Sequence, residues 1–222
     1  MPVFTLSKRL SFPPPHLAIK EGLLAVGGDL SVDRLLLAYR SGIFPWYAKG
    51  EPILWWSPDP RLVLYPDELS VSKSLKKILK RNLFRITFNQ NFEAVIQGCA
   101  ETKRAYGDGT WITDEMKSAY IALHKTGYAH SVEAWQDGNI VGGLYGVALG
   151  RVFFGESMFS RVSNASKVAF VTFVENLRRL KFALIDCQVR TDHLMRFGAR
   201  EIPRKVFLEQ VEKAIGNNSI HQ

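Results

Sequence analysis

Residues 131–189 constrain the fold of this chain more than any other part of its sequence. Alternating side chains and many aromatic or branched residues predict three consecutive strands there, at 131–136, 140–149 and 151–159. The turn signals Asp137-Gly138 and Gly150-Arg151 separate these strands. Because such short connections join antiparallel neighbours, the three strands are predicted to form a meander.

A helical pattern at 165–180 and a further strand at 184–189 follow the meander. A helix between two strands of one sheet is the usual crossover between parallel neighbours. We therefore expect an α/β (α+β) protein with a mixed sheet and flanking helices. Shorter patterns predict a strand at 85–88 and helices at 92–100, 113–127, 192–197 and 205–215.

The composition is that of an ordinary globular protein, with 222 residues of which 46% are hydrophobic and 23% charged. No apolar run approaches the roughly 18 residues of a membrane span. Residues 1–15 lack the continuous apolar segment of a signal peptide. With only two cysteines, Cys99 and Cys187, the sequence predicts a cytoplasmic protein with free thiols and no membrane partner.

Residues 1–60 are expected to be irregular, because proline and glycine turn signals interrupt them repeatedly. Within them, Ser31 is expected to cap a short helix that ends before Gly42. Three of the five tryptophans follow close together, at Trp46, Trp55 and Trp56. They could anchor a small domain on a larger one, or offer flat surfaces on which a base stacks.

Residues 70–81 predict an amphipathic helix with one apolar and one basic face. The basic face carries Lys73, Lys76, Lys77, Lys80 and Arg81. A solvated helix face usually mixes both signs of charge, so five cations without an acid favour contact with phosphates. The net charge points the same way, because residues 1–70 are balanced and the rest of the chain holds the whole surplus of +8.

Polar side chains occur within two of the most apolar predicted strands. Glu156 lies in GESMFS at 155–160, and Asp186 and Gln188 lie in IDCQV at 185–189. If the two strands are neighbours, these side chains can lie together, although alternation leaves open whether they face a site or water. A carboxylate can accept the proton of an attacking amine and an amide can orient that amine, so the set suits aminolysis.

Other chemistries fit the sequence less well. The five histidines show no metal-ligand spacing, so no metal is expected. A nucleophilic thiol at Cys187, paired with His193, is disfavoured because Ile185 and Val189 indicate an apolar surrounding in which a thiol is usually inert.

The two strand motifs belong to a longer set that spans almost the whole chain. The set comprises GLLAVGGDLS at 22–31, GIFPW at 42–46, ILWWSPDPR at 53–61, GTWIT at 109–113, GESMFS at 155–160, NASK at 164–167, IDCQV at 185–189, Gly198-Ala199 and EIPR at 201–204. In these motifs the chain strongly resembles the bacterial leucyl/phenylalanyl-tRNA–protein transferases.

This resemblance implies a small N-terminal domain at 1–62 and an acetyltransferase-like (GNAT) catalytic domain at 63–222. It implies transfer of Leu or Phe, and less well Met, from aminoacyl-tRNA to proteins that begin with Arg or Lys, which marks them for degradation by the N-end rule. It implies no cofactor. By the same resemblance, Asp186 and Gln188 are the catalytic pair, and Glu156 engages the acceptor's basic N-terminus or assists the pair.

The resemblance also implies substrate-binding residues. Trp46 and Trp111 are expected to hold the terminal adenosine, with Tyr39 and Tyr120 nearby, and the basic helix is expected to contact the tRNA backbone. The expected pocket for the aminoacyl side chain consists of Leu144, Phe153, Gly155, Ser157, Met158, Phe173 and Ile185. Strict alternation puts part of this pocket on the strand face opposite to Glu156, so we expect either a bulge at Gly155 or a ligand between splayed strands.

Two other functions stay open on the sequence. An acetyl-CoA-dependent N-acetyltransferase of the same fold class would need a glycine-containing turn to hold a pyrophosphate, and residues 160–166 contain no glycine. A non-catalytic RNA-binding module would use Trp46, Trp111 and the basic helix, but it would leave Asp186 and Gln188 without a role.

Overall fold

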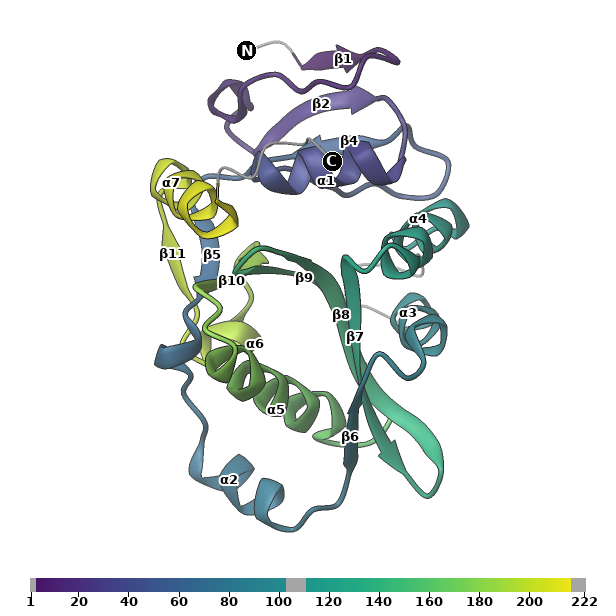
Figure 1. The fold of residues 1–222 in the computed structure, drawn as a ribbon, viewed down its shortest axis with the longest axis vertical. Helices are drawn as coiled ribbons and strands as arrows, with labels where there is room; N and C mark the ends of the chain where they lie inside the picture. The colour runs from purple at the N-terminus through teal and green to yellow at the C-terminus, as the bar shows by residue number, and fades with distance from the viewer. Residues whose placement is uncertain (1–2, 103–110, 217–222) are drawn as a thin grey trace.

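The N-terminal part of the chain forms a small sheet of its own (Figure 1). The computed structural model describes residues 3–102 and 111–216. The order of the small sheet is β1 (Phe4–Leu6), β2 (Leu23–Gly27), β4 (Leu54–Trp56) and β3 (Phe44–Pro45). The expectation of an irregular N-terminal region was therefore wrong, because strands of two to five residues are too short to show alternation.

Helix α1 (Val32–Arg40) covers this small sheet. The side chain of Ser31 accepts a hydrogen bond from the backbone of Arg34, which confirms the predicted cap. One short 3₁₀ helix, η1 (Pro15–Leu17), precedes α1 in the chain, and a second, η2 (Pro66–Glu68), follows the last strand of the small sheet.

The larger sheet has seven strands. Their order is β11 (Arg200–Ile202), β5 (Arg61–Leu64), β10 (Leu184–Gln188), β9 (Val152–Ser160), β8 (Asn139–Leu149), β7 (Ala129–Gln136) and β6 (Arg85–Phe88). Strands β9 and β10 are parallel, and the other neighbours are antiparallel. The predicted meander and the helical crossover, α5 (Ala165–Arg179), are thus confirmed, as is the mixed α/β sheet with flanking helices.

Helices cover both faces of this sheet (Figure 1). Helices α3 (Phe92–Ala100) and α4 (Asp114–Lys125) lie on one face, while α5 and α2 (Lys73–Lys80) lie on the other. The core is accordingly divided into two apolar clusters, and the central strands contribute side chains to both. In the described part of the chain no helix has the length and apolar character needed to cross a membrane.

Some predicted boundaries were wrong. Helix α2 begins at Lys73 rather than at 70, because Ser72 caps it by accepting a hydrogen bond from the backbone of Leu75. Helices α6 (Asp192–Met195) and α7 (Arg204–Ile215) differ from their predicted ranges by one or two residues. The expected domain boundary between 62 and 63 falls within β5, and it stays a prediction.

Strands β9 and β10 pair only over a short stretch and then part. The last paired residues are Phe154 and Asp186. Beyond them, the register between β8 and β9 shifts so that Glu156 is the extra residue of a bulge, next to the expected Gly155. Strand β10 is also irregular before Gln188, whose φ of 63° is left-handed. A bulge and parted strands therefore occur together, and side chains from both sheet faces reach the opening.

Candidate active site

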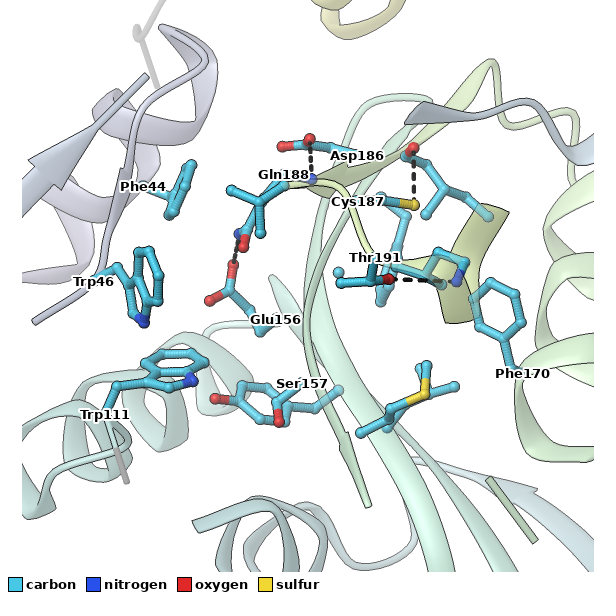
Figure 2. Close-up of a pocket in the computed structure, with 18 of the residues that line it drawn as sticks. Phe44, Trp46, Trp111, Glu156, Ser157, Phe170, Asp186, Cys187, Gln188 and Thr191 are labelled. Carbon is cyan, nitrogen blue, oxygen red and sulfur yellow. Dashed lines mark hydrogen bonds between the residues drawn. The ribbon is translucent and has the colours of Figure 1, made fainter. Parts of the chain in front are cut away.

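A pocket of about 200 Å³ lies where β9 and β10 part, facing strand β3 of the small sheet (Figure 2). Eleven expected site residues line it: Trp46, Trp111, Leu144, Phe153, Gly155, Glu156, Ser157, Met158, Ile185, Asp186 and Gln188. The other lining residues were not among the expected site residues: they are Phe44, Pro45, Tyr145, Phe170, Cys187, Val189, Thr191 and Leu194. Segments from both sheets thus form one largely apolar pocket with a polar centre.

Two tryptophans stand at one end of the pocket. Figure 2 shows Trp46 and Trp111 close to each other beside Phe44, while Phe170 lies at the opposite end. Trp46 is 44% exposed, and the indole N–H of Trp56 donates to its carbonyl over 2.7 Å. The tryptophan end can therefore offer flat surfaces to a ligand that enters from solvent. Of the expected motif at 109–113, positions 109 and 110 lie outside the described residues.

Trp55 has a different place. It is fully buried in the core, and its indole N–H donates to the carbonyl of Gly27 over 2.8 Å. Trp55 is therefore a core residue, and of the two functions considered for the tryptophan cluster only the open surface has support, at Trp46.

Helix α5 contributes Phe170 to the pocket and not the expected Phe173. Phe173 packs edge-on against Phe153 with ring centroids 4.5 Å apart, so it supports the wall from behind. The two phenylalanines are three positions apart and share one helix face, which is why periodicity alone could not separate them. Leu194 of α6 completes this apolar end.

Glu156 is the titratable group at the polar centre. Its side chain is 9% exposed, and burial raises the pKa of its carboxyl group to about 7. The value of about 7 is a balance: the nearby charge of Asp186 adds to the effect of burial, while hydrogen bonds from Tyr120, Tyr39 and Gln188 oppose it. A carboxyl group with this pKa can accept a proton near neutral pH and can give it back.

Tyr39 and Tyr120 do not line the pocket, contrary to the expectation of substrate contact. Both are fully buried behind Glu156, and each hydroxyl lies 2.8 Å from one of its carboxylate oxygens. Burial and the charge of Glu156 hold the pKa of both tyrosines well above its ordinary value, so they remain protonated donors. Both tyrosines lie within predicted helices, but the sequence could not show what their hydroxyls meet.

The two hydroxyl groups also lie within hydrogen-bonding distance of each other. When Glu156 is ionised, both hydroxyls can donate to it. When Glu156 is protonated, it can donate to Tyr120, which donates to Tyr39, which donates back to the second carboxylate oxygen. The network can therefore hold a proton on Glu156 or release it when the O–H bond of Tyr120 turns, without moving a heavy atom.

Asp186 is held by a residue that the sequence did not single out as functional. The guanidinium of Arg61 donates to both carboxylate oxygens, at 2.8 and 2.6 Å, and neither side chain is more than 1% exposed. Arg61 itself lies between the rings of Phe44 and Phe207, at 4.7 and 4.6 Å from their centroids. Such a buried bidentate pair holds Asp186 in one position.

Gln188 links the two carboxylates. Its backbone N–H donates to Asp186 over 2.9 Å, and its side-chain amide nitrogen donates to Glu156 over 2.9 Å. Because the amide nitrogen is turned toward Glu156, the amide oxygen points the other way. The left-handed backbone of Gln188, a conformation that non-glycine residues seldom adopt, is thus supported by Asp186 and aims the amide at Glu156.

Cys187 lines the pocket, but its environment does not suit a nucleophile. Burial, and then the charge of Asp186, raise the pKa of its thiol well above the ordinary value. Among residues 3–102 and 111–216 there is also no group of three or more histidine, cysteine, aspartate or glutamate side chains that could hold a metal ion.

The expected tRNA-backbone residues lie on α2 and at its C-cap, Arg81, away from β9 and β10 (Figure 1). All five are exposed: Lys73, Lys76, Lys77, Lys80 and Arg81. No ion pair that the structure records among its described residues involves any of them. Helix α2 therefore presents a cationic surface without nearby counter-charges.

Comparisons with known proteins identify the family. Residues 63–212 match the family model of the leucyl/phenylalanyl-tRNA protein transferase, and residues 28–59 match that of its N-terminal domain. A leucyl/phenylalanyl-tRNA–protein transferase of Syntrophobacter fumaroxidans is 62% identical over 208 residues, which cover 94% of this chain and 89% of that protein. A protein of the same name from Stutzerimonas stutzeri is 62% identical over 202 residues, covering 90% of this chain and 89% of the relative.

Solved structures are more distant. A GCN5-related N-acetyltransferase from Kribbella flavida has a TM-score of 0.39 at 12% identity, covering 76% of this chain and 59% of its own. The L-PGS structure from Bacillus licheniformis has a TM-score of 0.41 at 10% identity, and the match covers 73% of this chain and 52% of that one.

Proposed function

The chain belongs to the leucyl/phenylalanyl-tRNA–protein transferase family, and on this premise we propose that it moves Leu or Phe, and less well Met, from aminoacyl-tRNA to proteins that begin with Arg or Lys. The observation that carries the proposal is the polar centre of the pocket. Glu156, with a pKa of about 7, and Gln188 stand between an apolar end and a tryptophan end. The proposed product is a cytoplasmic protein marked for degradation by the N-end rule.

The two ends of the pocket suit the two parts of the donor. The apolar end, with Leu144, Phe153, Met158, Phe170 and Ile185, can bury an uncharged leucyl, phenylalanyl or methionyl side chain. The tryptophan end can stack on the terminal adenosine. The ester carbonyl would then lie between the ends, beside Glu156 and Gln188.

The acceptor is an α-amino group. Its pKa of roughly 7.7–8.0 leaves a usable neutral fraction near pH 7. In the proposed reaction its nitrogen attacks the ester carbonyl carbon, a C–N bond forms, and the bond from that carbon to the ribose oxygen breaks. The proton lost by nitrogen passes to Glu156 and from there to the ribose oxygen, so no further reactant is needed. The acidic centre also favours an acceptor with a basic first residue.

The remaining polar groups have positioning roles in this proposal. The amide oxygen of Gln188 accepts a hydrogen bond from the attacking amine and turns its lone pair toward the carbonyl. Asp186, which is fully buried and paired with Arg61, holds the backbone of Gln188. Of the two carboxylates, Glu156 is the one proposed to take the proton, because it is not neutralised by an ion pair.

The test is transfer of radiolabelled Leu or Phe from charged tRNA to a peptide that begins with Arg. Wild-type protein should label this peptide, and it should not label the same peptide with an acetylated N-terminus. Glu156→Gln and Gln188→Ala should reduce the rate at least about a hundredfold, as expected when a proton acceptor or an orienting group is lost. Absence of transfer by the wild-type protein would refute the proposed function.

A matched control is available on β7. Glu133 is also fully buried, and the hydroxyls of Thr87 and Ser131 donate to it at 2.5 and 2.6 Å, but it does not line the pocket. Glu133→Gln therefore makes the same chemical change outside the site. If it slows transfer as much as Glu156→Gln does, the losses reflect the fold, and the role given to Glu156 is wrong.

A further inference from the structure

A second cavity of about 300 Å³ lies beyond the active-site pocket. It is bounded by the start of α2, the start of α5, and α6, which are on the same side of the larger sheet (Figure 1). Helix α6 separates the two cavities, since Leu194 lines the active-site pocket while His193 and Arg196 line the second cavity.

The charged side chains of this cavity are all cationic or basic. Lys167, His193 and Arg196 line it together with serine hydroxyls, and no carboxylate is among its lining residues. Within the described ranges, no recorded ion pair involves Lys167 or Arg196, although Lys167 is partly buried. Cations that share a cavity without a counter-charge repel one another, and a bound anion would offset that repulsion.

His193 adds a polar atom without a partner. Its Nε2 atom is buried and makes no hydrogen bond among the described residues, while its ring packs edge-on against Phe197 at 5.3 Å. Buried polar atoms without a partner are rare in proteins, and an absent ligand is one explanation for them. In the tautomer that carries its proton on Nε2, this nitrogen can donate to an oxygen atom of an anion in the cavity.

We propose that this cavity binds a backbone phosphate of the tRNA donor. The inference rests on the proposed function, and it adds a docking site between the two surfaces already assigned to tRNA. The active-site pocket would hold the aminoacyl end, and the basic face of α2 would contact the backbone farther away. The cavity lies between them, because it shares α6 with the pocket and Ser72 and Leu75 with α2.

The proposal also gives a role to a motif that the catalytic centre does not use. The segment NASK at 164–167 begins α5, and both Asn164 and Lys167 line the second cavity. A phosphate there would fix the donor relative to α6, and α6 carries a wall of the aminoacyl pocket. Phosphate contacts position a nucleic acid without reading its sequence, so this site would favour no particular base.

The test compares two double variants, each of which removes two positive charges. Lys167→Gln/Arg196→Gln removes the two cations of the cavity. Arg178→Gln/Arg179→Gln, at the exposed far end of α5, is the control. Each protein is assayed with Phe-tRNA and with phenylalanyl-adenosine, a donor that has the ester and the adenosine but no phosphate. Affinity for uncharged tRNA is measured across a series of salt concentrations.

We expect Lys167→Gln/Arg196→Gln to raise KM for Phe-tRNA about tenfold or more, since charge-assisted contacts to phosphate are lost. Its rate with phenylalanyl-adenosine should equal that of the wild type. The slope of log affinity against log salt should become smaller by roughly 1 to 2. The control variant should match the wild type in all three measurements.

Several results would overturn the inference. One is an unchanged KM for Phe-tRNA in Lys167→Gln/Arg196→Gln. A second is an equally large rise of KM in the control variant. A third is a loss of activity of Lys167→Gln/Arg196→Gln with phenylalanyl-adenosine as large as its loss with Phe-tRNA. Binding of coenzyme A that Lys167→Gln/Arg196→Gln abolishes, with tRNA affinity unchanged, would assign the cavity to a nucleotide thioester instead. If wild-type protein transfers from neither donor, the proposed function itself fails, which is a separate outcome.

Discussion

The hydroxyl of Tyr120 should set the pH at which transfer becomes fast. Tyr120→Phe removes one hydrogen bond of 2.8 Å from the carboxylate of Glu156 and leaves the buried ring in place. A hydrogen bond to a charged group contributes about 1.5–3 kcal/mol, and one to a neutral group about 1 kcal/mol. The ionised form of Glu156 therefore loses about 0.5–2 kcal/mol more than the neutral form, which raises its pKa by about one unit.

The sign and size of the effect follow from the role of Glu156 as proton acceptor. Only the ionised form can accept a proton, so the rate should rise with pH through the wild-type pKa of about 7. In Tyr120→Phe this rise should occur about one unit higher. At pH 7 the ionised fraction then falls from about one half to about one tenth, a loss of about fivefold, while at pH 9 the two rates should nearly coincide.

The assay is the rate of label transfer to an Arg-starting peptide between pH 5.5 and 9 at saturating donor. Titration of the acceptor amine affects both proteins equally, so the difference between the two profiles isolates Glu156. Tyr65→Phe is the control, because its hydroxyl also donates over 2.8 Å, to Gln210, and Tyr65 does not line the pocket. A Tyr120→Phe profile that coincides with the wild type, or moves to lower pH, would refute the reasoning.

Three further outcomes are expected. Arg61→Met leaves Asp186 buried without its partner and should lower the free energy of unfolding in urea by about 3–5 kcal/mol. The double variant Arg61→Met/Asp186→Asn should recover part of that loss. Equal stability of the two variants would contradict the role of the ion pair. The pKa of Glu156 is about 7 in the folded protein and 4.5 ordinarily, so between these pH values the folded state binds more protons, and its stability should fall by up to about 3 kcal/mol as pH rises. Glu156→Gln should remove that part of the pH dependence in urea titrations. An unchanged pH dependence would show that other groups cause it. Lys76→Glu/Lys77→Glu should weaken tRNA binding and flatten its salt dependence, and an unchanged slope in filter binding would argue against phosphate contact by α2.

The sequence by itself determined the central part of the fold. Alternation and turn residues are local properties, so the meander and the crossover helix could be predicted from 131–189. The pairing of β9 with β10 then followed from general topology, and it brought Glu156 near Asp186 and Gln188. The family assignment came from motifs that are contiguous in the chain, and the family models and relatives confirm it.

Only the tertiary structure decided what each polar group meets. Arg61, Tyr39 and Tyr120 lie 125, 117 and 36 positions from the carboxylates they contact, so no local pattern could reveal those contacts. The bulge at Glu156 and the left-handed backbone at Gln188 depend on the strand partners, and they decide which side chains enter the pocket. The sequence could therefore place two carboxylates side by side, but their different surroundings, an arginine for one and tyrosine hydroxyls for the other, arise from long-range packing.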